Sequence, residues 1–183
     1  MTDDRLIKVS KYLSKHLRHS PERIGLALLP GGWVGVDDLL DALARHRFPI
    51  DFDELVEVVE RNDKQRFAFT PDGAQIRASQ GHSVDVDLQL AEVEPPPILF
   101  HGTVATFLEA IRAAGLIRGR RHHVHLSVDR QTATRVGSRR GQPVVLTVDS
   151  AAMHGAGYKF FVSANGVWLT DHVPPSFLAA QGP

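Results

Sequence analysis

The run Glu94-Pro95-Pro96-Pro97 restricts the fold of this chain more than any other feature of its sequence. Three consecutive prolines cannot continue a helix or a central strand, and they favour a stiff, extended connection. A chain of 183 residues is long enough for two small lobes, and a hydrophobic content of 43% is ample for packed cores. We therefore predict two lobes, residues 1–93 and 98–183, joined by a proline linker at 94–97.

The first lobe is predicted to open with an amphipathic helix over residues 4–18. Its apolar positions recur at helical spacing, and its basic positions fall on the opposite side of the helical wheel. The apolar positions are Leu6, Val9, Leu13 and Leu17, and the basic ones are Lys8, Lys11, Lys15 and Arg18. We expect one face to enter the core and the basic face to meet an anionic partner.

The rest of this lobe is predicted to consist of short strands and helices. We predict short strands at 26–29 and 33–34, a helix capped by Asp37, and a helix over 53–61. A strand over 64–70 would place Phe67 and Phe69 on one face and Lys64 and Arg66 on the other. Helices followed by a small β-wing resemble a winged-helix module, which commonly binds nucleic acid.

The second lobe is predicted to be richer in strands, so the fold class is α+β. Strands are expected at 98–100, 123–127, 144–148, 158–162 and 167–170, with helices at 105–114 and after Asp129. Asn165-Gly166 between two such runs is a strong hairpin signal.

Charge is segregated along the chain, although the formal net charge is zero. Residues 5–23 hold six Lys or Arg and one acid, residues 112–140 hold eight Arg and one acid, and residues 37–60 hold eight acids and two Arg. Two basic blocks favour nucleic acid as the partner, while two solvated faces balanced by an acidic one would give the same pattern. There are no cysteines, no apolar run long enough to cross a bilayer and no signal-peptide pattern, so we expect a cytoplasmic monomer without membrane contact.

Arginines beside histidines are the strongest chemical signal. They occur in Arg18-His19, in Lys64-Gln65-Arg66 and in Arg121-His122-His123-Val124-His125, and a further motif is His101-Gly102-Thr103. Arginine binds phosphate through two parallel hydrogen bonds, and histidine can donate or exchange a proton near neutral pH. No third ligand at suitable spacing completes a metal site with His123 and His125, so we expect no metal.

Two other functions fit parts of this pattern. The motifs His101-Gly102-Thr103 and His125-Leu126-Ser127 have the form used by two-histidine cyclic phosphoesterases, in which the imidazoles act as acid and base. That interpretation gives no role to Arg18 or Arg66. A non-catalytic RNA-binding protein would explain the basic helix but not the second lobe.

In combination, the motifs resemble the NAD-dependent RNA 2′-phosphotransferase family. The similarity is carried by segments 10–14, 17–19, 32–34, 38–40, 64–67, 76–83, 101–103, 121–127, 165–169 and 173–174, in family order along nearly the whole chain. It departs from the family pattern at Gly119 and Arg140. Arg120 beside Arg121 leaves a one-residue ambiguity in the key arginine, which the Arg-x-His-Val-His spacing settles in favour of Arg121.

The resemblance implies an RNA-binding lobe joined to a lobe of the ADP-ribosyltransferase type that binds NAD. It implies transfer of an internal RNA 2′-phosphate to NAD through an ADP-ribosylated RNA 2′-phosphate, which gives a 2′-hydroxyl, ADP-ribose 1″,2″-cyclic phosphate and nicotinamide. The substrate would be a tRNA-like RNA, as in tRNA splicing. By motif match, the catalytic group is Arg18, His19, Arg66 and Arg121. The NAD contacts would be His101, Gly102, Thr103, His125 and Ser127, and the RNA contacts Lys8, Lys11, Lys15 and Lys64.

Overall fold

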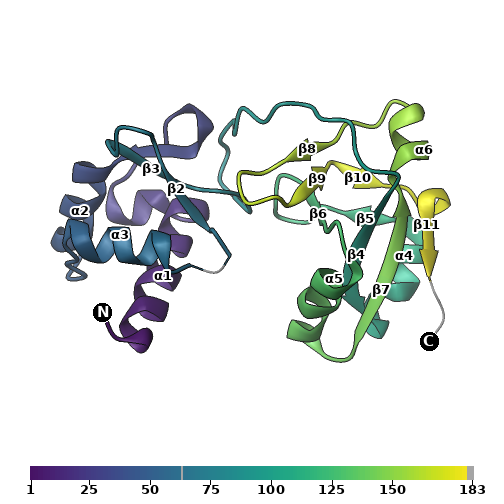
Figure 1. Cartoon of the computed structure of the whole chain (residues 1–183), viewed down its shortest axis with the longest axis horizontal. Helices are drawn as coiled ribbons and strands as arrows, with labels where there is room; N and C mark the ends of the chain where they lie inside the picture. The colour runs from purple at the N-terminus through teal and green to yellow at the C-terminus, as the bar shows by residue number, and fades with distance from the viewer. Residues whose placement is uncertain (63, 181–183) are drawn as a thin grey trace. The chain divides into compact units, whose positions relative to one another are not determined.

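The chain forms two compact units in a computed structural model that describes residues 1–62 and 64–180. Unit 1 is Met1–Leu90 and unit 2 is Ala91–Pro183 (Figure 1). Both mix helices with small antiparallel sheets, which is the predicted α+β class. The boundary falls ahead of Glu94, because the proline run packs on unit 2: Ser150 Oγ donates to the Pro96 carbonyl at 2.6 Å and Ala151 N to the Pro97 carbonyl at 3.1 Å.

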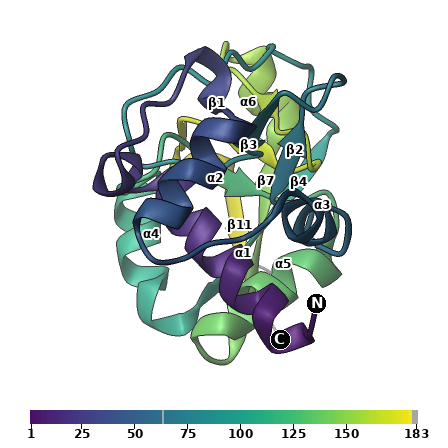
Figure 2. The same ribbon diagram turned by 90° about the vertical axis from the view of Figure 1, so that its left-hand side faces the viewer.

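The described residues of unit 1 form three helices and one three-stranded sheet (Figure 2). The helices are α1 (Asp3–Arg18), α2 (Val36–Arg45) and α3 (Phe52–Glu60), with short 3-10 turns at Pro21–Ile24 and Pro30–Gly32. The strands are β1 (Trp33–Gly35), β2 (Phe67–Phe69) and β3 (Gln75–Ala78), and β3 lies between the other two.

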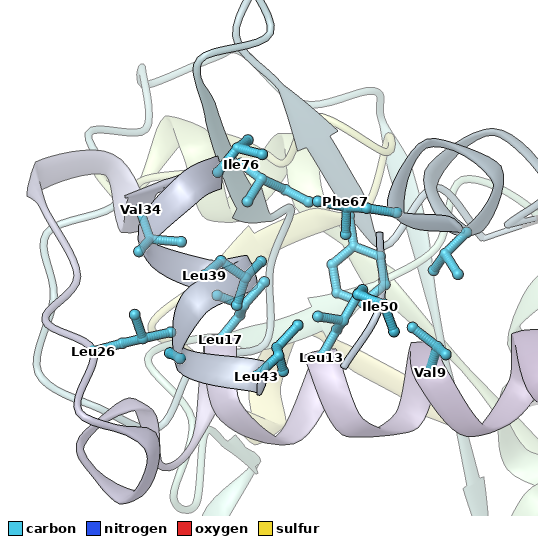
Figure 3. Packing of buried hydrophobic residues seen from close by; sticks show 14 of the residues in the cluster. Val9, Leu13, Leu17, Leu26, Val34, Leu39, Leu43, Ile50, Phe67 and Ile76 are labelled. Carbon is cyan, nitrogen blue, oxygen red and sulfur yellow. The ribbon is translucent and has the colours of Figure 1, made fainter. Parts of the chain in front are cut away.

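The core of unit 1 is built on the apolar face of α1. Val9, Leu13 and Leu17 are fully buried, and Leu6 packs partly buried at the edge of the same cluster, as the spacing predicts (Figure 3). Leu39 and Leu43 of α2 complete the centre. Burial of each such leucine stabilises the fold by roughly 2 kcal/mol. This packing fixes which side of α1 remains at the surface.

Three predicted elements of unit 1 differ in the structure: the strand at 26–29, the helix cap at Asp37 and the strand over 64–70. Segment 26–29 is not a strand; only Leu29 pairs, with Trp33, across a turn that contains Gly31 and Gly32 at positive φ. Helix α2 starts at Val36 with Gly35 as its N-cap, so Asp37 lies in the first turn and is not the cap.

The predicted strand over 64–70 is confirmed only for Phe67–Phe69. Gln65 has a φ of 41°, which breaks the extended alternation, and its carbonyl accepts from Ser79 Oγ at 2.7 Å. Lys64 and Arg66 therefore do not project from one face of a strand, and that prediction was wrong.

Unit 2 contains short helices and small sheets (Figure 1). One sheet has the order β11-β7-β4, a second β6-β9-β8, and β10 pairs with β5. The strands are β4 (Ile98–Val104), β5 (Leu116–Ile117), β6 (Val124–Leu126), β7 (Pro143–Asp149), β8 (Phe161–Val162), β9 (Trp168–Thr170), β10 (His172–Val173) and β11 (Leu178–Ala180). The helices are α4 (Leu108–Ala114), α5 (Arg130–Gly137) and α6 (Ser150–Gly155), with 3-10 turns at Ala105–Phe107, Ser138–Arg140 and Pro175–Phe177.

Several predictions for unit 2 are confirmed. Asp129 caps α5 by accepting from Thr132 N, and β8 and β9 form the hairpin around Gly166, whose φ is 74°. Strand β4 is longer than expected, because all three residues of His101-Gly102-Thr103 pair with β7. The strand expected at 158–162 is limited to its last two residues. Within residues 1–62 and 64–180, no helix is both long and apolar enough to cross a membrane.

Candidate functional site

The exposed side of α1 forms one wall of a pocket of about 540 Å³ in unit 1. We call this pocket the basic groove. It is lined by Leu6, Ile7, Ser10, Lys11, Ser14, Lys15, Arg18, His19, Arg61, Asn62, Lys64 and Arg66. Six of these residues are Lys or Arg, and none of the described lining residues is acidic. Such a surface attracts a polyanion at long range.

Arg18 and Arg66 lie together in the basic groove. Nη2 of Arg18 donates to the Arg66 carbonyl at 3.3 Å, and the same carbonyl accepts from Ser79 N at 2.8 Å. The Arg18 guanidinium also lies over the Phe67 ring, 6.0 Å from its centroid. Since Arg18 ends α1, its charge is further stabilised by the partial negative charge of the helix C-terminus. The Arg18 side chain is therefore held by its neighbours, in the same pocket that Arg66 lines.

His19 follows α1 as its C-cap residue and also lines the basic groove. Its Nδ1 lies 2.9 Å from Ser83 Oγ, and Ser83 N donates to the Arg18 carbonyl at 2.9 Å. Segment 83–84 thus fixes the end of the helix and the imidazole together. Sequence reasoning gave Ser83 no role, although it lies in one of the motifs that carry the family resemblance.

The predicted lysines separate into two groups. Lys11, Lys15 and Lys64 line the basic groove, whereas Lys8 does not. The Lys8 ammonium lies 5.9 Å from the centroid of the Phe48 ring, which is itself stacked on Tyr12. Lys8 therefore lies outside the basic groove, whereas the other three lysines line it.

The predicted residues of unit 2 meet where β4 and β6 approach each other. Phe100 and Ser127 exchange two backbone hydrogen bonds of 2.8 Å, which join β4 to the end of β6. Directly beside them, His101 Nδ1 lies 3.0 Å from the His125 carbonyl. A carbonyl can only accept, so Nδ1 carries the proton and Nε2 is left as the acceptor of a neutral ring. Burial, together with the nearby Arg140, lowers the pKa of His101, which favours that neutral form.

Arg121 contacts His125 from the loop before β6. Its Nη1 lies 3.0 Å from His125 Nδ1, which must accept because a guanidinium has no acceptor. Partial desolvation, and then repulsion from Arg140 and Arg139, lowers the pKa of Arg121. The neighbourhood is thus strongly positive. Arg121, which lies at the Arg-x-His-Val-His spacing, is the arginine that contacts the histidine.

Gly102 and Thr103 have structural roles on β4. A Cβ at Gly102 would lie far inside van der Waals contact of the Ala133 carbonyl oxygen, so glycine is needed for α5 to pack on β4. Packing alone therefore requires glycine at position 102, and its contact with NAD stays a prediction. Thr103 is buried and pairs with Val144.

The described residues hold no group of three His, Asp or Glu side chains placed to bind a metal ion. His123 lies 3.8 Å from the Asp171 carboxylate through its Nε2 and packs against the Phe161 ring. Burial lowers the pKa of His123, with the Asp171 carboxylate acting in the opposite direction. Its contacts are those of a packed histidine.

Each unit thus carries one group of the predicted residues. Arg18, His19, Arg66, Lys11, Lys15 and Lys64 gather in the basic groove of unit 1, and His101, His125, Ser127 and Arg121 gather beside β4 and β6 of unit 2. Two arginines in a cationic pocket form a surface of the kind that can bind a phosphate group.

Comparison with known proteins identifies the family. The model of the RNA 2'-phosphotransferase, Tpt1 / KptA family matches residues 4–172, and the chain belongs to this family. It is 62% identical to a probable RNA 2'-phosphotransferase of Streptomyces coelicolor over 183 residues, which cover all of both chains. Relatives of the same name from Trichormus variabilis and Flavobacterium johnsoniae are 56% and 51% identical, each over 97% of this chain and 98% of the relative.

Proposed function

We propose that this protein removes an internal 2′-phosphate from a tRNA-like RNA by transferring it to NAD. The products would be RNA with a 2′-hydroxyl, ADP-ribose 1″,2″-cyclic phosphate and nicotinamide. Membership of the RNA 2'-phosphotransferase family supports the phosphate transfer. The dependence on NAD and the identity of the products come from the family resemblance of the motifs.

The observation that carries the proposal is that Arg18 and Arg66 both line the basic groove. A phosphate monoester carries nearly two negative charges and three acceptor oxygens, which two guanidinium groups can satisfy together. Lys11, Lys15 and Lys64 extend the positive surface for neighbouring backbone phosphates. We therefore assign RNA to unit 1, as a winged-helix-like RNA-binding lobe.

We assign NAD to unit 2, as a lobe of the ADP-ribosyltransferase type. The neutral His101 offers Nε2 as an acceptor, and the backbone of Ser127 pairs with Phe100, the residue before His101. Arg121, Arg139 and Arg140 produce a positive field that suits a diphosphate. Of the residues that the resemblance assigned to NAD, Gly102 and Thr103 would shape β4 and not contact the ligand through side chains.

The residue types suit a two-step transfer. In the first step the 2′-phosphate oxygen attacks the ribose carbon that bears nicotinamide, and nicotinamide leaves neutral, so neither a base nor an acid is required. In the second step the adjacent ribose hydroxyl attacks the phosphorus, its proton is lost, and the RNA 2′-oxygen leaves and takes up a proton. Charge increases at the phosphoryl oxygens in this step, where arginines such as Arg18 and Arg66 stabilise most.

The test is incubation with an RNA that carries one internal 2′-phosphate, with and without NAD, in the presence and absence of a metal chelator. We expect loss of the 2′-phosphate only with NAD, and no effect of the chelator. Cleavage of a cyclic phosphate without NAD would instead indicate a two-histidine phosphoesterase. Binding without any reaction would indicate an RNA-binding protein.

A further inference from the structure

Asn62 connects the two walls of the basic groove. It lies between α3 and β2, it lines the groove, and only 5% of its surface is exposed. Its Oδ1 lies 3.1 Å from Arg66 Nη1 and 3.2 Å from Lys64 N, and its Nδ2 lies 3.2 Å from Ser10 Oγ on α1. One amide thus links Arg66, the backbone before it and the helix on the other wall.

The orientation of this amide follows from its partners. A guanidinium and a backbone N–H can only donate, so the atom that faces Arg66 and Lys64 must be the oxygen. The amino group then faces Ser10, whose hydroxyl can accept. All three contacts are satisfied at once in a buried position, where an unsatisfied polar group would be costly. The Arg66 side chain is therefore fixed at one nitrogen before any ligand arrives.

An amide at this position differs from a carboxylate in one decisive respect. A buried aspartate in the same place could keep the bonds to Arg66 and Lys64 and accept from the Ser10 hydroxyl, but it would add a negative charge 3.1 Å from the arginine. That charge would compete with a phosphate for Arg66. Asparagine orients the guanidinium and leaves its positive charge for the ligand.

We propose that Asn62 is a positioning residue, which holds Arg66 in place across the basic groove for binding of the 2′-phosphate. This inference rests on the proposed function of the groove. It predicts that the neutrality of the residue at position 62 matters as much as its hydrogen bonds.

The experiment compares Asn62→Asp with the parent in two assays. One is binding of adenosine 2′-monophosphate, which reports on the anion site without turnover, and the other is single-turnover reaction with 2′-phosphorylated RNA and NAD. We expect Asn62→Asp to weaken nucleotide binding about tenfold or more, because like charges are brought together. The melting temperature and the affinity for NAD should stay close to the parent values. Gln75→Glu is the matched control, since it makes the same amide-to-carboxylate change in β3 of unit 1 at a residue that does not line the groove.

Asn62→Ala and Ser10→Ala complete the test. Asn62→Ala removes the link without adding charge, so it should weaken binding less than Asn62→Asp does, and Ser10→Ala should have the smallest effect. If Asn62→Asp binds the nucleotide as tightly as Gln75→Glu, the proposal is wrong. If Asn62→Asp does not fold, Ser10→Ala and Asn62→Ala decide: unchanged nucleotide binding in both overturns the proposal. A parent protein that binds the nucleotide but fails to process the RNA would refute the proposed function and leave this inference standing.

Discussion

The candidate residues of unit 1 and unit 2 are held in different ways. In unit 1 they line a cationic pocket on a helix surface and in the loop before β2, and side-chain hydrogen bonds position them. In unit 2 they lie on or next to paired strands, where His101 is anchored to the backbone of His125 and Gly102 is closed off by α5. We infer that unit 1 acts mainly through charge and that unit 2 acts mainly through fixed geometry. The two units should therefore respond differently to substitution, salt and pH.

The largest effect is expected for the arginine pair of unit 1. Arg18→Ala or Arg66→Ala removes a guanidinium from the basic groove, and each should lower the rate of 2′-phosphate removal on the order of 100-fold. Single-turnover kinetics with saturating NAD measure this loss. Arg45→Ala, at the end of α2 and outside the groove, is the control. If both arginine variants kept the parental rate of 2′-phosphate removal, unit 1 would have no part in the reaction.

A large effect on stability is expected at Gly102 in unit 2. The added methyl of Gly102→Ala collides with the backbone of α5 and should destabilise the unit by about 3 kcal/mol. Gly155→Ala is the matched control, because a Cβ there meets nothing within 4 Å. The free energy of unfolding of both variants is measured in urea, with amide hydrogen exchange as the probe. Equal stability of the two would show that α5 is not packed against β4 as described.

Salt dependence should separate the groove lysines from Lys8. Removing Lys11 and Lys15 should reduce the slope of log affinity for RNA against log salt by roughly one or less per lysine. Lys8→Ala should leave the slope unchanged, since that ammonium lies by Phe48 outside the groove. RNA titrations at four salt concentrations provide the measurement. A Lys8 effect as large as that of Lys11 would mean that the whole basic face of α1 contacts RNA.

The smallest expected effect is a pH dependence in unit 2. The folded pKa of His101 is lowered, so below about pH 6.5 the unfolded chain binds more protons, and stability falls as pH decreases from there toward the folded pKa. His101→Asn keeps a donor for the His125 carbonyl but cannot be protonated in this range. Its unfolding midpoint in urea should therefore decline less between pH 7 and pH 5. A decline as steep as in the parent would assign the dependence to other groups, such as His123 or His16, whose pKa values are also lowered by burial.

The spacing of apolar residues correctly predicted elements that bury one face and expose the other. Helix α1 and its buried leucines follow directly from apolar spacing, and the cap at Asp129 and the turn at Gly166 follow from local turn chemistry. The segment around Gln65 was mispredicted, because alternation of charged and apolar residues looks like a strand. Gln65 has a positive φ instead: its N–H donates to the Asn62 carbonyl at 2.7 Å, and its carbonyl accepts from Ser79 Oγ, a contact that no local pattern reveals.

The sequence indicated which residues gather in each unit but not what holds them. Arginine beside histidine indicated phosphate chemistry, and the structure brings Arg18, His19 and Arg66 into one pocket. No motif pointed to Asn62, because its partners are Ser10, far away in the chain, and the side chain of Arg66. Similarly, the role of Gly102 depends on the distant helix α5.

The most direct test of the division between the units is a crossed binding measurement. Equilibrium affinities for 2′-phosphorylated RNA and for NAD would be measured separately with the parent, Arg66→Ala and His101→Ala. We predict that Arg66→Ala weakens RNA binding and leaves NAD binding unchanged, and that His101→Ala does the reverse. If either variant is folded like the parent but loses affinity for both ligands equally, the assignment of RNA to unit 1 and NAD to unit 2 is contradicted.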